Sequence, residues 1–227
     1  MGVRLRVVAY NIHSSRDDLN ALAAVVRGLN PDILIVQEGP RRFRWRTKAA
    51  ALAHSFHLVY ATGGQPSLGN VLMTNLKVRV RETWDVRFPL KPGRHMRGAA
   101  FARCEVGGVG FTVVGTHLST DDEERPSQTD LARSTTGLRA DVLKVAHHGS
   151  SKQDEALIDA LGARLAVISV GVDNDYGHPA PSTLRLLARA DLQVRRTDLD
   201  GDVAVVVDGA GRLRSASRMP RVRPAGQ

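Results

Sequence analysis

Two adjacent histidines, His147 and His148, follow a short apolar run in the stretch ADVLKVAHHGSS, residues 140–151. The run predicts a buried strand that ends just before them, and Gly149 permits a turn close to a ligand. Ligands collect at the carboxyl ends of strands in α/β sheets, and imidazole is a common ligand of zinc and manganese. Both histidines reach one site only if the turn has begun at His148, because side chains alternate across a strand. The pair therefore indicates a metal site that needs further ligands; the alternative is one capping and one solvent histidine.

A third histidine, His178, lies in the polar turn DNDYGHP that follows a second apolar run at residues 165–170. Asn174 in this turn is a candidate substrate-binding residue. The sequence thus predicts a second ligand-rich loop at the end of a strand.

The stretch from Leu138 to Gly209 closely resembles the last part of the metallo-β-lactamase-like domain of ComEC-type DNA-internalisation competence proteins. Four motifs carry the resemblance, in order: ADVLKVAHHGS, ISVG, YGHP and RTDLDGDV. It implies a metal-dependent phosphodiesterase fold in which His147, His148 and His178 bind a metal ion or phosphate. That family also has an upstream His-x-His-x-Asp-His motif and a Thr-Gly-Asp turn. The nearest stretches here, THLSTDD and TGL, keep only part of these ligands.

Asn11 and Glu38 each follow a predicted strand, at residues 3–10 and 32–36. A predicted helix from Asp17 or Asp18 to Leu29 connects the strands, and a β-helix-β connection favours parallel neighbours whose carboxyl ends meet. An amide and a carboxylate placed together suit magnesium, which takes oxygen ligands. Taken singly, the asparagine is also typical of a turn and the glutamate of a surface.

Four segments within residues 3–119 resemble, in order, the front half of the endonuclease/exonuclease/phosphatase family of DNase I-like enzymes. They are RVVAYNIHSS, PDILIVQE, GNVLMTN and VVGTHLS. The resemblance implies that Asn11 and Glu38 bind magnesium and that His117 contacts the scissile phosphate or acts as an acid. The family's later Gly-Asp-x-Asn loop and Ser-Asp-His ending are not found in their expected places.

The charge of the chain favours a polyanionic partner. The net charge is +9 and arginine outnumbers lysine, which suits phosphate binding by paired hydrogen bonds. In the run RRFRW, Arg41 and Arg44 are candidates to clamp phosphates while Phe43 or Trp45 stacks on a base; the alternative is the solvated face of an amphipathic helix. Arg97, after Arg94 and His95, either contacts phosphate or flanks a loop.

Other features exclude several classes of protein. The single Cys104 rules out an intrachain disulfide framework and a multi-cysteine zinc site. No apolar run is long enough for a signal h-region or a membrane span, so we expect a soluble, cytoplasmic protein. With 42% hydrophobic residues, 227 residues can bury a real core.

The remaining pattern predicts alternating helices and strands. One predicted helix begins in the RRFRW run and ends at Ala53, and two more span residues 154–161 and 182–190. The predicted strands span residues 71–74, 78–88, 96–106, 109–118, 165–170, 193–197 and 203–207. Gly107-Gly108 predicts a tight hairpin turn, and Asp198 to Asp202 predicts another. From Arg212 onward the chain is basic and predicted to be loose.

These observations predict an α/β fold, and the two resemblances imply a four-layer α/β/β/α sandwich that could be assembled from halves of two related architectures. The predicted parts are residues 1–119, a joint at 120–137, residues 138–215 and a loose basic tail at 216–227. The predicted function is a metal-dependent phosphodiester hydrolase, a DNA nuclease, that uses magnesium or manganese, with zinc as the alternative. One alternative is a non-catalytic basic DNA-binding remnant or chimera, and another is a phosphoesterase for a lipid or a small molecule. The sequence indicates no obligate protein partner.

Overall fold

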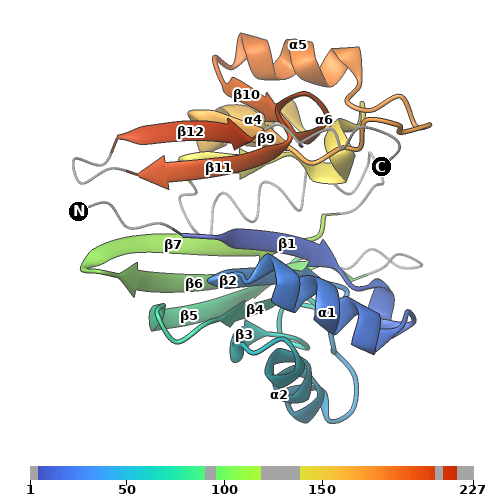
Figure 1. The fold of residues 1–227 in the computed structure, drawn as a ribbon, viewed down its shortest axis with the longest axis vertical. Coiled ribbons are helices and arrows are strands. Elements are labelled where there is room, and N and C mark those ends of the chain that lie inside the picture. Colours follow the sequence, from blue (N-terminus) through green and yellow to red (C-terminus); the bar gives the residue numbers. More distant parts are fainter. Residues whose placement is uncertain (1–4, 90–95, 119–138, 208–211, 219–227) are drawn as a thin grey trace, which may run out of the picture. The chain divides into compact units, whose positions relative to one another are not determined.

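A computed structural model describes residues 5–89, 96–118, 139–207 and 212–218. The chain divides into two compact units, Val3–Ala132 and Arg133–Gln227, the second of which also takes in Met1–Gly2 (Figure 1). Both units combine helices with sheets, so the predicted α/β class is confirmed. The predicted joint at 120–137 lies outside the described residues.

The first unit is built around a four-stranded sheet in the order β1-β2-β4-β3. Its strands are β1 (Val7–Asn11), β2 (Ile33–Gln37), β3 (Val59–Gly63) and β4 (Val71–Thr74). β1 and β2 are parallel and pair in a register that sets Asn11 opposite Gln37. The predicted β-helix-β connection is therefore confirmed, and it brings the residues that follow both strands to one edge of the sheet.

Two helices cover one face of this sheet (Figure 1). Helix α1 (Leu19–Leu29) begins after Asp18, whose carboxylate accepts from the backbone N–H groups of Asn20 and Ala21. Helix α2 (Trp45–Ser55) follows β2 after a short turn. The buried side chains of both helices pack on alternate residues of β2 and β4, as the helical spacing of the apolar residues predicts.

A second, antiparallel sheet covers the opposite face of β2 and β4. It consists of β5 (Arg79–Arg87), β6 (Gly98–Val106) and β7 (Val109–Thr116), and the β6–β7 hairpin turns at Gly107-Gly108 as predicted. Ile33 and Leu72 of the first sheet share a buried cluster with Ala100 and Val113 of the second. The first unit therefore has three layers: helices, sheet and sheet.

The second unit contains a three-stranded parallel sheet in the order β10-β9-β8 and a separate hairpin. The sheet strands are β8 (Val142–Lys144), β9 (Leu165–Ile168) and β10 (Gln193–Arg196), and the hairpin strands are β11 (Asp202–Val207) and β12 (Leu213–Arg218). Helices α4 (Glu155–Leu161) and α5 (Pro181–Arg189) pack their buried residues on this sheet. The parallel order places the chain after β8 and the chain after β9 at one edge.

Two predictions in the second unit are wrong. Asp198 lies in a single helical turn, α6 (Thr197–Asp200), because β10 pairs with β9 and β11 pairs with β12, so no hairpin joins β10 to β11. Residues 213–218, predicted to be loose, form β12. The backbone of β11 pairs with that of β12, and the basic composition of residues 213–218 concealed this strand.

Candidate functional site

Asn11 and Glu38 are in direct contact at the carboxyl ends of β1 and β2. The Nδ2 group of Asn11 donates to Oε1 of Glu38 at 3.0 Å, and the Ser14 hydroxyl donates to Oε2 at 3.3 Å. The backbone N–H of His13 donates to Asn11 Oδ1 at 2.9 Å, which fixes which end of the amide faces the carboxylate. Asn11 therefore orients Glu38, and its oxygen, the atom predicted to bind a metal, already accepts one hydrogen bond.

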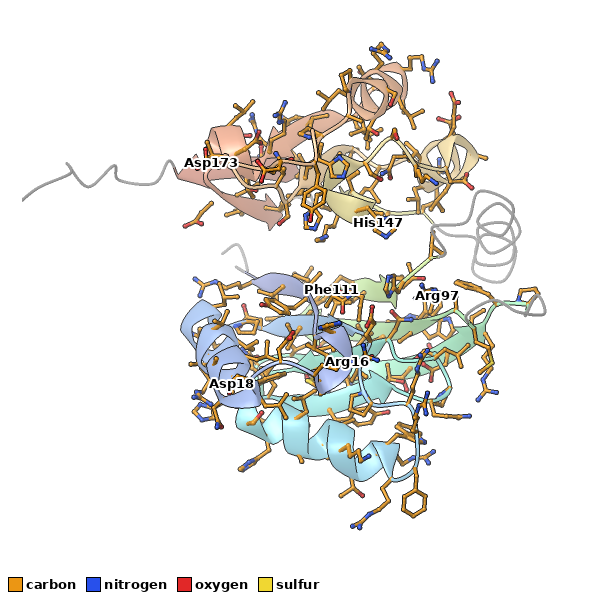
Figure 2. All side chains as sticks on the ribbon, turned by 90° about the vertical axis from the view of Figure 1, so that its right-hand side faces the viewer. Arg16, Asp18, Arg97, Phe111, His147 and Asp173 are labelled. Atoms are coloured by element: carbon orange, nitrogen blue, oxygen red, sulfur yellow. The ribbon has the colours of Figure 1, made fainter. Side chains whose placement is uncertain are left out.

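The carboxylate of Glu38 is held in its charged form. The hydrogen bond from Asn11 lowers the pKa of Glu38, and the nearby positive charges of His117 and Arg97 lower it further, against the opposing effect of partial burial. Arg97 immediately precedes β6 (Figure 2), and His117 immediately follows β7. We call Asn11, Ser14, Glu38, Arg97 and His117 the Glu38 cluster.

The backbone around Glu38 departs from ordinary strand geometry. Glu38 has φ of 55°, and His13, Ser14 and Ser15 beside it have φ between 47° and 59°. Left-handed conformations are costly for residues other than glycine and persist where the surroundings impose them, most often at functional sites. The unusual backbone at these strand ends therefore marks Asn11 and Glu38 as a candidate functional site.

A backbone hydrogen bond at Gly39 fixes the position of the chain directly after Glu38. The N–H of Gly39 donates to the carbonyl of Gly69 at 2.7 Å. A Cβ at Gly39 would lie 2.8 Å from Val71 Cγ2, so only glycine allows this approach. The glycine after Glu38 thus joins the end of β2 to the start of β4.

The sequence missed two groups of this site. Ser14 was not singled out, although it lies three residues after Asn11 in the motif that carries the resemblance. Asn70, buried at 2% exposure, donates to the carbonyls of Ser67 and Gly98, the residue after Arg97. The signal in the sequence is an asparagine directly before a continuous apolar run, because an amide buried with such a strand requires hydrogen-bond partners.

In the second unit, both histidines of the pair lie in a turn that begins at Ala146. His147 and His148 have φ of 48° and 56°, and Gly149 has φ of 80°. The carbonyl of Ser169, which follows β9, lies 2.6 Å from His148 Nδ1. A carbonyl only accepts, so Nδ1 carries a proton, and in the neutral ring this is the tautomer that has its lone pair on Nε2, as many metal-binding imidazoles do.

The loop that carries His178 contacts the same turn. The N–H of Ala180 donates to the carbonyl of Gly149 at 2.8 Å, and a Cβ at Gly149 would lie 2.6 Å from Pro179 Cβ. His178 Nδ1 is buried, and no group in the described part of the chain reaches it. Even so, no group of three His, Cys, Asp or Glu side chains is arranged to hold a metal ion among the described residues.

Asn174, predicted to bind substrate, makes hydrogen bonds within its own loop. Its amide oxygen accepts from the N–H of His178 at 3.0 Å, while Nδ2 donates to the carbonyls of His178 and Gly171. Both ends of the amide are therefore engaged within the loop. His147 is half-buried, and Figure 2 marks its place and that of Asp173 in this unit.

The predicted substrate-binding arginines differ in exposure. Arg41 is partly buried, and its Nη1 donates to the carbonyl of Leu68 at 3.3 Å. Arg44 is exposed in a left-handed conformation directly before α2. Arg97, described above, is half-buried beside Glu38. Arg94 and His95 lie outside the described residues.

Comparison with known proteins gives a family and a partial relative. A model of the Endonuclease/Exonuclease/phosphatase family matches residues 8–207, well beyond the 3–119 that carry the motifs. ComE operon protein 3 of Bacillus subtilis (strain 168) is 36% identical over 100 residues, which are 44% of this chain and 12% of that protein. The chain thus spans a small part of that relative's length.

Solved structures match at low identity. One is an endonuclease/exonuclease/phosphatase from Beutenbergia cavernae DSM 12333, with 23% identity and a TM-score of 0.45 over 61% of this chain and 46% of the other. Another is D. rerio TDP2 complexed with a single strand DNA product, with 17% identity and a TM-score of 0.45 over 58% and 53%. No helix among the described residues has the length and apolar character to cross a membrane.

Proposed function

Because the chain belongs to the Endonuclease/Exonuclease/phosphatase family, we propose that it is a metal-dependent phosphodiester hydrolase that acts on DNA. The observation that carries the proposal is the Glu38 carboxylate, which is clamped by Asn11 and Ser14 beside two groups that can carry positive charge. A charged carboxylate that can hold a metal ion, beside cations that can face a phosphate, suits metal-assisted hydrolysis of a phosphodiester.

The donor chemistry of the Glu38 cluster fits magnesium or manganese. Glu38 supplies an ionised carboxylate, and magnesium commonly binds through one or two carboxylates while it keeps several waters. When bound, such an ion polarises the phosphate and lowers the pKa of a bound water. Glu38 would hold the ion, and Asn11 either holds the carboxylate in place or adds its oxygen as a second ligand.

Two further residues of the cluster have roles in the proposal. His117 donates a proton to the leaving oxygen or contacts the phosphate, and an imidazole is suited to both at neutral pH. Arg97 places a permanent positive charge beside the same carboxylate, where it can neutralise a phosphate oxygen. Ser14 acts through Glu38 and is a positioning residue, and Asn11 has the same role when its oxygen does not bind the ion.

The second unit carries a candidate site of its own. We propose that His147, His148 and His178 bind a second ion or the phosphate, with zinc as the alternative metal there. The hydrogen bond from His148 Nδ1 to the Ser169 carbonyl supports this, because it leaves Nε2 as an acceptor. Substitution of His148 by alanine tests this part separately.

The experiment compares two substrates, supercoiled plasmid and bis(p-nitrophenyl) phosphate, with Mg²⁺, Mn²⁺ or a chelator. Glu38→Gln should lower both rates by at least about 100-fold, as expected for the loss of a metal-binding or acid–base group. Glu82→Gln is the matched control, because Glu82 lies on the surface of β5 in an ion pair with Arg103. A rate that survives both the chelator and Glu38→Gln would overturn the proposal.

Other outcomes separate the alternatives. Plasmid binding without hydrolysis of either substrate would identify a basic DNA-binding module. Hydrolysis of a small phosphoester or a phospholipid, with plasmid left intact, would identify the small-molecule phosphoesterase.

A further inference from the structure

The turn between β2 and α2 presents a phenylalanine to solvent between two arginines. Phe43 is 84% exposed, and Arg42 and Arg44 beside it are also exposed. We propose that Arg42, Phe43 and Arg44 form a stacking site for an unpaired base of single-stranded nucleic acid. The proposal rests on the proposed function and names the form of nucleic acid that the Glu38 cluster receives.

The other aromatic residue of this turn is fixed within the fold. The Trp45 ring meets the Tyr60 ring edge-on at 6.4 Å between centroids, and the guanidinium of Arg46 lies 4.2 Å from the Trp45 ring centroid. A Cβ at Gly64 would lie 2.4 Å from the Trp45 ring, so the tryptophan fills the space above this glycine. Trp45 therefore anchors the turn, and Phe43 is the ring that remains available to a base.

The charges around Phe43 are suited to a phosphate backbone. Within the part of the chain that the structure describes, no carboxylate forms an ion pair with Arg42 or Arg44. The first turn of α2 contains no acidic residue, so the positive end of the helix dipole is not neutralised there. A ring flanked by two guanidinium groups combines base stacking with backbone attraction, which is how proteins bind single strands.

Single exposed apolar residues are common, so the setting of Phe43 has to be compared with others. Leu76 is 93% exposed and Tyr176 is 84% exposed. Leu76 has one cationic neighbour in sequence, Lys77, and Tyr176 follows Asp175. Phe43 alone of the three lies between two arginines and close in sequence to Glu38.

The distance along the chain suits one bound strand. Phe43 is five residues from Glu38, which limits their Cα separation to about 18 Å at full extension. A Cβ at Gly69 would lie 3.4 Å from Arg41 Cδ and 3.6 Å from the Glu38 Cα, so Arg41 borders the same glycine as Glu38. A single nucleic-acid strand with one phosphate at the Glu38 cluster can therefore place a base, at most a few nucleotides away, on the Phe43 ring.

The test is fluorescence anisotropy of a labelled oligothymidylate in the presence of a chelator, so that binding is measured without cleavage. Phe43→Ala should weaken binding by about fivefold to 150-fold, the range found when a stacking residue is truncated. Phe43→Trp should retain binding and Phe43→Leu should not, because leucine is apolar but has no ring. Leu76→Ala is the matched control and should bind as the wild type does.

Three results would overturn the proposal: unchanged binding by Phe43→Ala, full binding by Phe43→Leu, or an equal loss for a duplex of the same length. The last result would indicate a duplex contact in place of base stacking. Hydrolysis of bis(p-nitrophenyl) phosphate is measured in parallel, since that substrate has no base. Normal hydrolysis of this substrate by Phe43→Ala together with weakened oligothymidylate binding supports the proposal. If the wild type hydrolyses neither substrate, the proposed function fails, but the comparison of oligothymidylate binding still tests the stacking site.

Discussion

The Asn70 side-chain amide donates to the carbonyl oxygen of Gly98 at 2.9 Å, and the Thr116 hydroxyl donates to the same oxygen at 3.0 Å. Gly98 follows Arg97 in the chain, and Thr116 precedes His117. One carbonyl thus receives two side chains from different strand ends. These bonds fix the spacing of the two groups whose charges lower the pKa of Glu38.

Removal of one of these hydrogen bonds should lower kcat clearly while it lowers the free energy of unfolding only a little. We expect Thr116→Val to lower kcat by about tenfold, because a displacement of His117 or Arg97 weakens contacts made in the transition state. The free energy of unfolding should fall by about 1 kcal/mol, the usual net value of one hydrogen bond. Thr116→Ser keeps the hydroxyl and should restore kcat. Equal kcat for Thr116→Val and the wild type would show that the bond does not position the site.

Gly115 controls the approach of β7 to the first sheet. A Cβ at Gly115 would lie 2.6 Å from Ile35 Cγ2 and 3.1 Å from Leu72 Cδ2. We expect Gly115→Ala to lower the free energy of unfolding by about 1–3 kcal/mol through overpacking. Urea unfolding followed by tryptophan fluorescence measures this, because both tryptophans lie in the first unit.

The matched control for Gly115 lies on the same strand. At Gly110 a Cβ would meet only the Cys104 carbonyl oxygen, at 4.0 Å, so Gly110→Ala should change stability by less than about 0.5 kcal/mol. Similar losses from Gly115→Ala and Gly110→Ala would show that space at Gly115 is not limiting.

The sequence predicted most elements of the fold because apolar periodicity is a local property. Helix α1 and strands β2 and β5 to β7 were found from spacing alone, and β12 was missed because its partner, β11, decides its structure. Asn11 and Glu38 were paired from the β-helix-β connection, which restricts where two strand ends can lie.

Side-chain hydrogen bonding in the site could not be predicted in the same way. Nothing local shows that Asn11 turns its amide nitrogen toward Glu38, or that Asn174 is engaged within its own loop. Both depend on backbone groups that the fold brings close: the N–H of His13 and the carbonyl of His178. Residue type therefore selected the candidate residues, and tertiary contacts decided which hydrogen bonds each of them makes.

Gly149 allows the histidine turn and the His178 loop to meet. Its φ is 80°, and a Cβ there would lie 2.6 Å from Pro179 Cβ. We expect Gly149→Ala to destabilise the second unit by about 1–3 kcal/mol, from strain and overpacking together. Hydrogen exchange resolved to the second unit measures this, since that unit has no tryptophan. Gly171→Ala, where a Cβ would have open space, should leave exchange unchanged. Faster exchange in Gly171→Ala than in Gly149→Ala would contradict the packing argument.

Asp85 makes the stability of the first unit depend on pH. Burial raises the pKa of Asp85 above its ordinary value, against the lowering effect of the neighbouring Ser67 hydroxyl, the hydrogen bond from Thr62 and the nearby Arg87. The folded state therefore holds a proton more tightly than the unfolded state does. Its contribution to stability is complete below the unfolded pKa of about 3.9 and is lost as pH rises through the folded pKa.

Asp85→Asn removes this dependence, because the amide does not ionise. The variant should match the wild type in acid and become the more stable of the two as pH rises past the folded pKa of Asp85. Urea unfolding across pH, followed by the fluorescence of Trp84, measures the difference; the Trp84 ring stacks on Phe101 at 5.1 Å, inside the unit that unfolds. Glu82→Gln serves as the surface control and should keep the wild-type slope. A difference between Asp85→Asn and the wild type that stays constant with pH would mean that the pKa of Asp85 is the same in the folded and unfolded states, so that burial does not raise it.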